Sequence, residues 1–565
     1  MSISAHQSTL TTQAKKLSPQ ALIQLIESAH QAAEDSRYDE AVEKFSLAIH
    51  SPYLKVEQRA KVCCSLAEAL ENLSRYREAL AIMAEYEGFV RRPDLTPETM
   101  FQLWLRMGSL HGYTGEHPRA ITYLKSALDF AETTEDQEKS GSCHYVMGRI
   151  YRAIGEAQFA RDHLQLALRF NRHVGEWFPL AQCYLMLGNI CLSEGDLMEA
   201  REHFDQSIKI IGEHRAPMLL GTIYNNISTI IVSQDFGRAG ESVVALEKAI
   251  KYLKEAKNDR ILANAYSNFG YALTQMGEWE RAAEMLHTAI ALSVVAGHRV
   301  VEGSSLDTLG EILLLQGRFE ESEQSLQKSI SYLQAANFTY AEVQTHQTLG
   351  RCYLAQGKFD LAQESFEAQL ALARRVEDKR NQTLSQIYLA RVQIEKKNLA
   401  AAQDLLNLVS EEIDTSSNAS IIGLFRIVNG ILSHELSNFE EARHDFGQAI
   451  TVFSIVKDPY REAYTRYRLG KTLLTTGDDG RGRLELRQAL EISRRLKAEP
   501  LSKMITAILP ETEPVADSPN FTLNDGVVNP AIVLRLTRAA SSRELLLNEL
   551  DISSRNYEGT SGYHL

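Results

Sequence analysis

The stretch YSNFGYALTQMGEWERAAEMLHTAI, residues 266–290, is followed by two variants of itself, LDTLGEILLLQGRFEESEQSLQKSI at 306–330 and HQTLGRCYLAQGKFDLAQESFEAQL at 346–370. A glycine stands fifth in each copy, a second glycine follows seven positions later, and an alanine or serine comes five positions after that. Copies at a fixed interval of 40 residues are typical of proteins built from stacked structural repeats. This stretch therefore predicts an all-α fold, specifically an α-solenoid.

Each copy has the pattern of two amphipathic helices joined by a turn. Apolar residues recur at steps of three and four on both sides of a glycine-containing break. We expect the first glycine, Gly350 in the third copy, to let the paired helices approach closely. The second glycine, Gly357, should end the first helix in a left-handed backbone conformation, and Ala362 should pack on the same seam from the second helix.

The same register extends in both directions and predicts about twelve helix-turn-helix units between residues 18 and 497. Their first small residues are Ala29, Ala67, Gly108, Gly148, Gly188, Ser228, Gly270, Gly310, Gly350, Ala390, Gly430 and Gly470. These units resemble the tetratricopeptide repeat family, in a subclass whose unit is longer than the common 34 residues and which is found in bacterial regulatory and signalling proteins. The resemblance implies a right-handed superhelix whose concave groove is lined by the first helix of each unit. It also implies a protein-protein interaction scaffold or regulatory protein that binds a peptide or protein segment in that groove.

The segments on either side of the repeats differ from them in composition. Residues 1–17 are polar and predict a disordered tail, and Ser18-Pro19 then reads as a helix N-cap followed by proline in the first turn. Residues 498–529 hold four of the chain's 13 prolines and an acidic stretch, which predicts a linker. Residues 530–565 predict an amphipathic helix and tail, through which the chain could self-associate.

The C-terminal helix also suggests an alternative function. Its sequence resembles the connector that follows tetratricopeptide arrays in bacterial signalling proteins. The chain would then be the sensor or regulatory arm of a signalling system, acting through an output domain absent from this chain.

Composition and motifs narrow the classes of function. The net charge of −13 argues against direct binding of nucleic acid, and no apolar run is long enough for a membrane span or signal peptide, so we expect a cytoplasmic protein. The six cysteines lack metal-ligand spacing and are expected in the core. Gly470-Lys471-Thr472 lacks the remainder of a phosphate-binding loop. We therefore expect no enzymatic activity, catalytic residue, metal or cofactor.

The family's groove geometry, transferred position by position, predicts a polar peptide-binding surface in units six to nine. Its candidate residues are Asn225, Thr229, Asn264, Ser267, Tyr271, Gln275, Asp307, Glu311, Gln347 and Arg351. Amide and hydroxyl side chains can hydrogen-bond the backbone of an extended peptide. A second interpretation is that these positions are polar only because they face water.

Two further patterns concern the last units. In units ten and eleven the same positions are apolar, which predicts a groove that changes from polar to apolar; they are Leu384, Ile387, Ile394, Leu424, Ile427 and Ile431. The last unit, residues 461–497, is rich in arginine and lysine. It could be a solvated end face or a docking patch for an acidic segment, including the chain's own linker.

Overall fold

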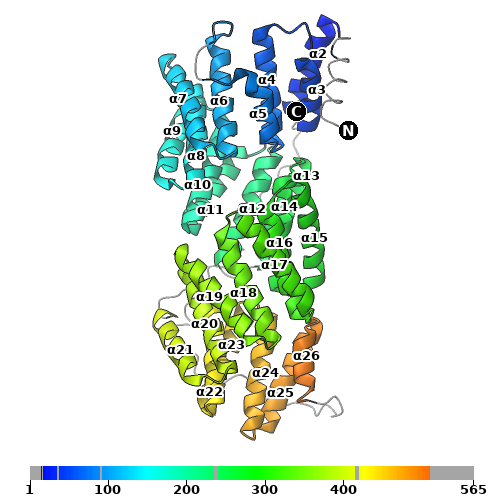
Figure 1. Ribbon diagram of the computed structural model, residues 1–565, viewed down its shortest axis with the longest axis vertical. Helices are drawn as coiled ribbons and strands as arrows, with labels where there is room; N and C mark the ends of the chain where they lie inside the picture. Colours follow the sequence, from blue (N-terminus) through cyan, green and yellow to red (C-terminus); the bar gives the residue numbers. More distant parts are fainter. Residues whose placement is uncertain are drawn as a thin grey trace, which may run out of the picture. The chain divides into compact units, whose positions relative to one another are not determined.

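The computed structural model describes residue 14 and residues 17–34, 37–88, 92–214, 216–234, 239–413 and 419–509. Across this part of the chain the regular structure is helical, and successive helices pack as antiparallel pairs (Figure 1). The predicted α-solenoid is therefore confirmed. The predicted tail at 1–17 and the predicted helix at 530–565 lie, apart from residues 14 and 17, outside the described residues.

Each predicted small residue falls in the first helix of a pair. These first helices are α2 (Pro19–Glu34), α4 (Val56–Asn72), α6 (Pro97–Tyr113), α8 (Gln137–Ile154), α10 (Trp177–Glu194), α12 (Pro217–Gln234), α14 (Asp259–Met276), α16 (Arg299–Gln316), α18 (Thr339–Ala355), α20 (Lys379–Glu395), α22 (Ala419–Glu435) and α24 (Pro459–Thr475). The second helices are α3 (Tyr38–Ile49), α5 (Tyr76–Met83), α7 (His117–Thr133), α9 (Ala157–Val174), α11 (Leu197–Ile211), α13 (Ala239–Glu255), α15 (Trp279–Val295), α17 (Phe319–Ala335), α19 (Phe359–Arg375), α21 (Leu399–Ile413), α23 (Phe439–Ile455) and α25 (Asp479–Arg495). A short 3-10 helix, η1 (Ala84–Tyr86), follows α5.

The seam within a pair is as close as the glycine pattern predicts. A Cβ atom added to Gly350 of α18 would lie 2.6 Å from the ring of Phe366 on α19. Real Cβ contacts are longer, so any larger residue would push the two helices apart. Ala362 is fully buried on the same seam.

Where the structure describes it, the turn after a first helix uses a left-handed residue, as expected for the second glycine. Gly357 has a φ of +73°. In units ten and eleven the same register position is held by Lys397 and Ser437, with φ of +64° and +63°. The repeat geometry therefore imposes this backbone conformation even where the chain supplies no glycine, at a cost in strain.

The ordered repeats continue past the predicted boundary at residue 497. An additional helix, α26 (Glu499–Thr506), packs on α25 and also contacts α16. Pro500, assigned from the sequence to the linker, lies in the first turn of α26, where a missing N–H group leaves no helical hydrogen bond unmade. The predicted start of the linker at 498 is therefore corrected, because proline at a helix start and proline in a linker look alike in the sequence.

The chain divides into two compact units. Unit 1 comprises residues 1–230 and 244–265, and unit 2 comprises residues 231–243 and 266–565. In unit 1, Asn258 Nδ2 donates a hydrogen bond to the Asn72 carbonyl oxygen at 3.3 Å, across 186 residues of sequence. In unit 2, the rings of Trp279 and Tyr460 lie 6.3 Å apart. In each unit, therefore, the stack of helix pairs curls far enough for distant parts of the sequence to meet.

Candidate functional site

A ladder of side chains crosses the first helices of unit 2 at one register position. Tyr271, Glu311, Arg351 and Arg391 each follow the small residue of their unit, on α14, α16, α18 and α20. Arg351 Nη1 donates a hydrogen bond to Glu311 Oε1 at 2.6 Å, and these side chains are 14% and 16% exposed. Glu311 and Arg351 are therefore in contact across the repeat interval while keeping some contact with solvent.

Helix α24 adds its own side chains to this ladder. The charge of Arg461 acts on Glu311, Arg351 and Tyr271, and the charge of Arg391 acts on Tyr464 and Arg468 of α24. We call this set the inner face of unit 2; its members are Tyr271, Asp307, Glu311, Arg351, Arg391, Arg461, Tyr464 and Arg468. It brings together groups that are up to about 200 residues apart in sequence.

The inner face contains two acids, Asp307 and Glu311, and among the described residues Asp307 has no ion-pair partner. Its side chain is buried, and its Oδ1 atom is buried without a hydrogen-bond partner in the described structure. Burial and the neighbouring charge of Glu311 raise the pKa of Asp307 to about 7, although the hydroxyl of Thr348 and the charge of Arg351 oppose the rise. Asp307 can therefore exchange a proton near neutral pH, or bind a cationic group that restores the missing partner.

Glu311 behaves in the opposite way because a guanidinium faces it. Burial would raise the pKa of its carboxyl, but Arg351, by its charge and its hydrogen bond, and then the charge of Arg461 hold that pKa below its usual range. Arg461 is held in place by Asp458, which caps α24 by accepting the Arg461 backbone N–H at 2.9 Å and also pairs with its guanidinium.

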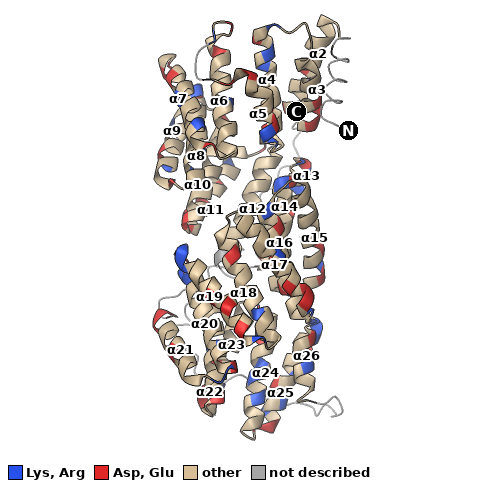
Figure 2. Cartoon of the chain, in the orientation of Figure 1, with Lys and Arg blue, Asp and Glu red and all other residues tan. Residues whose placement is uncertain are grey.

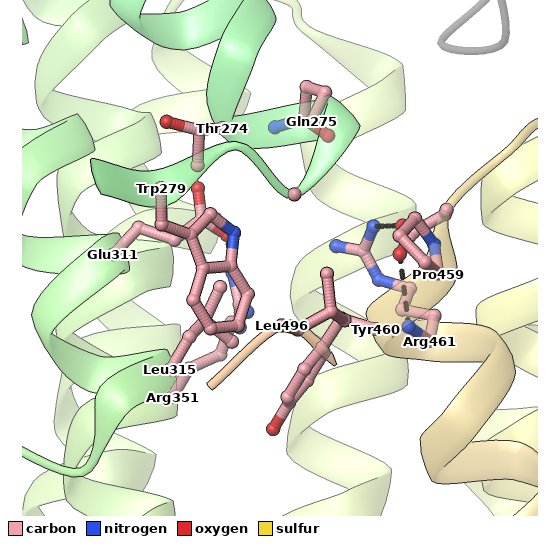
Figure 3. A pocket seen from close by; sticks show the side chains of 12 residues that line it. Thr274, Gln275, Trp279, Glu311, Leu315, Arg351, Pro459, Tyr460, Arg461 and Leu496 are labelled. Carbon is pink, nitrogen blue, oxygen red and sulfur yellow. Dashed lines mark hydrogen bonds and ion pairs between the residues drawn. The ribbon is translucent and has the colours of Figure 1, made fainter. Parts of the chain in front are cut away.

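A small, partly open cavity of about 30 Å³, with room for one or two water molecules, lies at the joint where α24 meets the start of α15. Figure 3 shows Glu311, Leu315 and Arg351 on one side of it, Tyr460 and Arg461 on the other, and Leu496 between them. This cavity is too small for a peptide side chain. It marks where unit 2 closes, beside the inner face.

Two glycines allow this closure. A Cβ atom on Gly277 would collide with the Leu496 side chain, and one on Gly317 would lie 2.7 Å from Pro500 of the α26 first turn. Both glycines also have left-handed φ angles, of +81° and +82°. On the surface of the joint, Lys497 pairs with Glu280. Gly277 and Gly317 therefore end first helices, and because they have no side chain they also leave room for the last helices of the array.

The inner face of unit 1 has a different arrangement of charge. Glu71 of α4 accepts hydrogen bonds from Arg106 Nη1 at 2.7 Å and from Ser109 Oγ at 2.6 Å, and Arg149 Nη1 lies 3.5 Å from the same carboxylate. The Arg149 guanidinium also lies 3.9 Å from the centre of the Tyr113 ring. We call Glu71, Arg106, Ser109, Tyr113 and Arg149 the inner face of unit 1. In this face the Glu71 carboxylate interacts with two arginines, Arg106 and Arg149.

The structure divides the ten predicted groove residues between the two units. Asn225, Thr229 and Asn264 belong to unit 1, and the other seven belong to unit 2. Tyr271, Asp307, Glu311 and Arg351 lie on the inner face, and Gln275 lines the cavity at the joint. Ser267 and Gln347 lie in seams between helices, where they accept hydrogen bonds from Ser305 Oγ at 2.9 Å and from Gln369 Nε2 at 3.2 Å. Asn225 is buried and Thr229 is exposed.

The predicted change to an apolar groove in units ten and eleven is wrong. Five of the six side chains concerned are buried in one hydrophobic cluster, and Leu384 packs against it; the five are Ile387, Ile394, Leu424, Ile427 and Ile431. They face the neighbouring helices because apolar surface is more stable there than in water. Unit ten instead presents Arg391 and Glu395 beside α24.

The six cysteines are buried with free thiols, as predicted. One of them, Cys191, lies near Glu199 and His203, with one ligand atom of each within 4.8 Å of the others. Arg161 already places Nη1 3.5 Å from Cys191 Sγ and 3.8 Å from Glu199. Because that guanidinium supplies the positive charge in this cluster, we assign no metal site to it.

Sequence reasoning missed the α24 contribution to the inner face. Arg461 and Tyr464 precede the small residue Gly470 by nine and six positions, and the missed residues also include Trp279, Tyr460 and Leu496 at the joint. The only signal in the sequence was the high arginine content of 461–497, which is also visible as blue segments on α24 and α25 in Figure 2.

With this geometry established, the comparisons with known proteins identify the repeat. Models of the tetratricopeptide repeat match residues 99–173, 181–214, 261–335 and 345–380. These segments of the chain are therefore tetratricopeptide repeats. The matches lie between the start of α6 and the start of α20, and they support a protein-interaction or regulatory role for the tetratricopeptide repeat array.

Solved structures with the same kind of fold include three examples. Aspartyl phosphate phosphatase F from Bacillus subtilis has 15% identity and a TM-score of 0.43, covering 63% of this chain and 94% of that one. The apo quorum sensor NprR from B. thuringiensis has 12% identity and a TM-score of 0.43, covering 62% and 99%. The Cut9-Hcn1 assembly of the APC/C has 14% identity and a TM-score of 0.43, covering 90% and 96%. At such values the likeness carries no information on function.

A search among curated proteins finds no match to the chain. Within the described residues, no helix is long and apolar enough to cross a membrane.

Proposed function

We propose that this tetratricopeptide repeat protein is a non-enzymatic interaction protein that binds an extended protein segment on the inner face of unit 2. The supporting observation is that Tyr271, Asp307, Glu311 and Arg351 converge with α24 on one surface. Other polar side chains of the first helices instead form hydrogen bonds within seams between helices, as Ser267 and Gln347 do.

The inner face of unit 2 offers both signs of charge to such a segment. Asp307 lacks a cationic partner, and the Arg391 Nη1 atom is buried without a hydrogen-bond partner in the described structure. Buried polar groups of this kind are costly unless a partner satisfies them. A bound segment that carries both a basic and an acidic group would satisfy both, which gives selectivity as well as affinity.

The test is affinity capture with the intact chain, followed by identification of the bound proteins by mass spectrometry. The inner-face variant is Glu311→Gln with Arg351→Gln, which removes two opposite charges together and leaves an uncharged polar side chain at both positions. The control is Arg318→Gln with Glu321→Gln, which removes both members of an exposed ion pair. We expect a partner that is lost from the inner-face variant and retained by the control.

The alternative function, a regulatory arm acting through the C-terminal segment, stays a prediction because residues 530–565 lie outside the described structure. Partners that bind both variants equally, but are lost when residues 530–565 are replaced by a Gly/Ser sequence of equal length, would favour that alternative and contradict binding at the inner face.

A further inference from the structure

The joint of unit 2 is a contact between turns and helix ends. On one side are the α14–α15 and α16–α17 turns, and on the other are the start of α24 and the α25–α26 turn; the residues in contact are Gly277, Trp279, Gly317, Tyr460, Leu496 and Pro500. Neighbouring helices of the solenoid instead pack directly on one another, as α16 does on α17 and α18. The joint is therefore one small non-covalent contact that closes a run of larger ones from α15 to α24.

Packing at the joint leaves room for water. Leu496 is buried, but the cavity of about 30 Å³ lies beside it and is also lined by the polar side chains of Thr274 and Gln275. The ion pair across the joint, between Lys497 and Glu280, is 65% and 73% exposed, so it contributes little. Separating the two sides of the joint therefore breaks few interactions.

The solenoid allows the joint to separate without unfolding. Each helix pair contacts its neighbours along the stack, so a small change of rotation at each step from α15 to α24 adds up to a large movement at the two ends. The seam within each pair, such as that between Gly350 and Phe366, stays closed during such a change. Local openings of this kind need less free energy than global unfolding. The joint is thus the place where unit 2 opens most easily.

The closed joint restricts access to the inner face. Glu311 and Arg351 both line the cavity at the joint, and Figure 3 shows them facing it. Their side chains are 16% and 14% exposed and are joined by a hydrogen bond of 2.6 Å. The cavity holds water but not a residue of a peptide. A segment that binds these two side chains therefore needs more space beside them than the closed unit provides.

We propose that the joint acts as a clasp, which opens to admit a protein segment to the inner face of unit 2. This inference rests on the proposed binding of a segment at that face. An opening at the joint lets an internal stretch of a partner, such as a loop or an exposed helix, enter from the side, without a free chain end. Because the segment binds the open form, it shifts the equilibrium toward that form, and its apparent affinity falls with the fraction of chains that are closed.

The first experiment locks the clasp in the full chain. Glu280→Cys with Lys497→Cys places two thiols at exposed, paired positions, and a short bis-maleimide reagent bridges them. The matched control is the same variant with each introduced thiol capped by N-ethylmaleimide, which makes the same substitutions without the bridge. The six native cysteines are buried and therefore react slowly with both reagents.

Hydrogen exchange then measures opening without any partner. We expect the bridge to slow exchange in α26 and in the α14–α15 turn by about tenfold or more relative to the capped chain, because it prevents the local opening. Exchange in α20 and α21 should be unchanged, since their seams do not separate. Equal rates in the bridged and capped chains would show that the joint does not open in the folded protein, which would overturn the clasp.

The second measurement uses the partner that is lost from Glu311→Gln with Arg351→Gln. The bridged chain should bind this partner at least about tenfold more weakly than the capped chain, because the binding-competent form is no longer populated. Equal binding would show that the segment reaches the inner face past a closed joint, and it would overturn the clasp while leaving the proposed function in place. If no partner depends on these two residues, the proposed function fails, and slower exchange in the bridged chain would still show that the joint opens.

Leu496→Ala tests the clasp from the opposite direction. Removing the side chain that lies against Gly277 favours opening, so exchange in α26 should be faster and the same partner should bind about threefold more tightly or better. Leu408→Ala, at a leucine that is 54% exposed on α21, is the matched control and should change neither quantity. Faster exchange in Leu496→Ala together with weaker binding would show that the closed form is the one that binds, and it would overturn the clasp.

Discussion

The inner faces of units 1 and 2 are built from the same helix pairs but balance their charges differently. In unit 1 the carboxylate of Glu71 is shared by Arg106, Arg149 and the Ser109 hydroxyl. Among the described residues of unit 2, Asp307 has no ion-pair partner, and Arg391 Nη1 is buried without a hydrogen-bond partner.

Under the proposed function, this difference separates a surface that stabilises the fold from a surface that is suited to binding. Saturated charges hold helices in register and leave little for a ligand to gain, whereas unsatisfied ones stabilise a complex at the expense of the free protein. The pKa values follow the same division. Burial raises the pKa of Asp307 to about 7, while burial of Glu71 is outweighed by its two arginines, so that its pKa is lowered.

The largest expected effect is that of Asp307→Asn. The unfolded chain releases this proton near pH 3.8 and the folded chain near 7, so ionisation penalises the folded state increasingly from about pH 4 to 7 and constantly above that. Asparagine should stabilise unit 2 by on the order of 4 kcal/mol at pH 8 and by almost nothing at pH 4. Hydrogen exchange of α16 and α18, corrected for intrinsic rates, measures this change. Asp360→Asn is the control at an exposed site.

Glu71→Gln should change the free energy of unfolding in the opposite direction to Asp307→Asn, because it destabilises the protein. Its effect should also depend on pH for the opposite reason. Because the folded pKa of Glu71 is lowered, its stabilisation is present above the unfolded value of 4.5 and is lost as pH falls through the folded value. Removing the charge leaves two half-buried arginines without their acid, which we expect to destabilise unit 1 by about 2–3 kcal/mol at pH 7. Faster hydrogen exchange in α4, α6 and α8, with α16 unchanged, is the readout. If Glu71→Gln accelerated exchange no more than the control Glu78→Gln at an exposed site, the structural role of Glu71 would be contradicted.

Gly277→Ala tests the joint that closes unit 2. Gly357→Ala is its matched control, because Gly357 has a similar φ of +73° against +81° but nothing within 4 Å of its Cβ position. The control should cost about 1–2 kcal/mol of backbone strain, and Gly277→Ala about 1–3 kcal/mol more because Leu496 must move. Exchange rates in α24 and α26 measure the difference. Equal effects at the two glycines would show that the joint is not tightly packed.

The smallest effect is expected for Lys497→Gln, on the surface of the same joint. Both partners of the Lys497–Glu280 pair are more than half exposed. Such pairs contribute less than about 1 kcal/mol and are screened by salt. Exchange in α26 should therefore remain close to that of the unmodified chain, and the small change should vanish in 1 M NaCl. A large effect would show that the ion pair, and not side-chain packing, holds the joint of unit 2 together.

The sequence by itself determined the repeat architecture. Spacing and small side chains located all twelve first helices, and they also predicted the close seam between Gly350 and Phe366 and the left-handed turn at Gly357. These features are local, because each follows from the helical period within a single unit. The same locality puts Tyr271, Glu311 and Arg351 at one register position of successive units.

Only the tertiary structure decided which of these positions form a site. Ser267 and Gln347 share the predicted polar character, yet they form hydrogen bonds within seams, and Ile387 and Ile431 are buried. The curvature of unit 2 then brings α24 and Leu496 against residues about 200 positions earlier. That curvature accumulates from small rotations between neighbouring helix pairs. The sequence of a single repeat does not determine this accumulated curvature. The contacts of α24 and the joint at Gly277 could therefore be identified only from the folded chain.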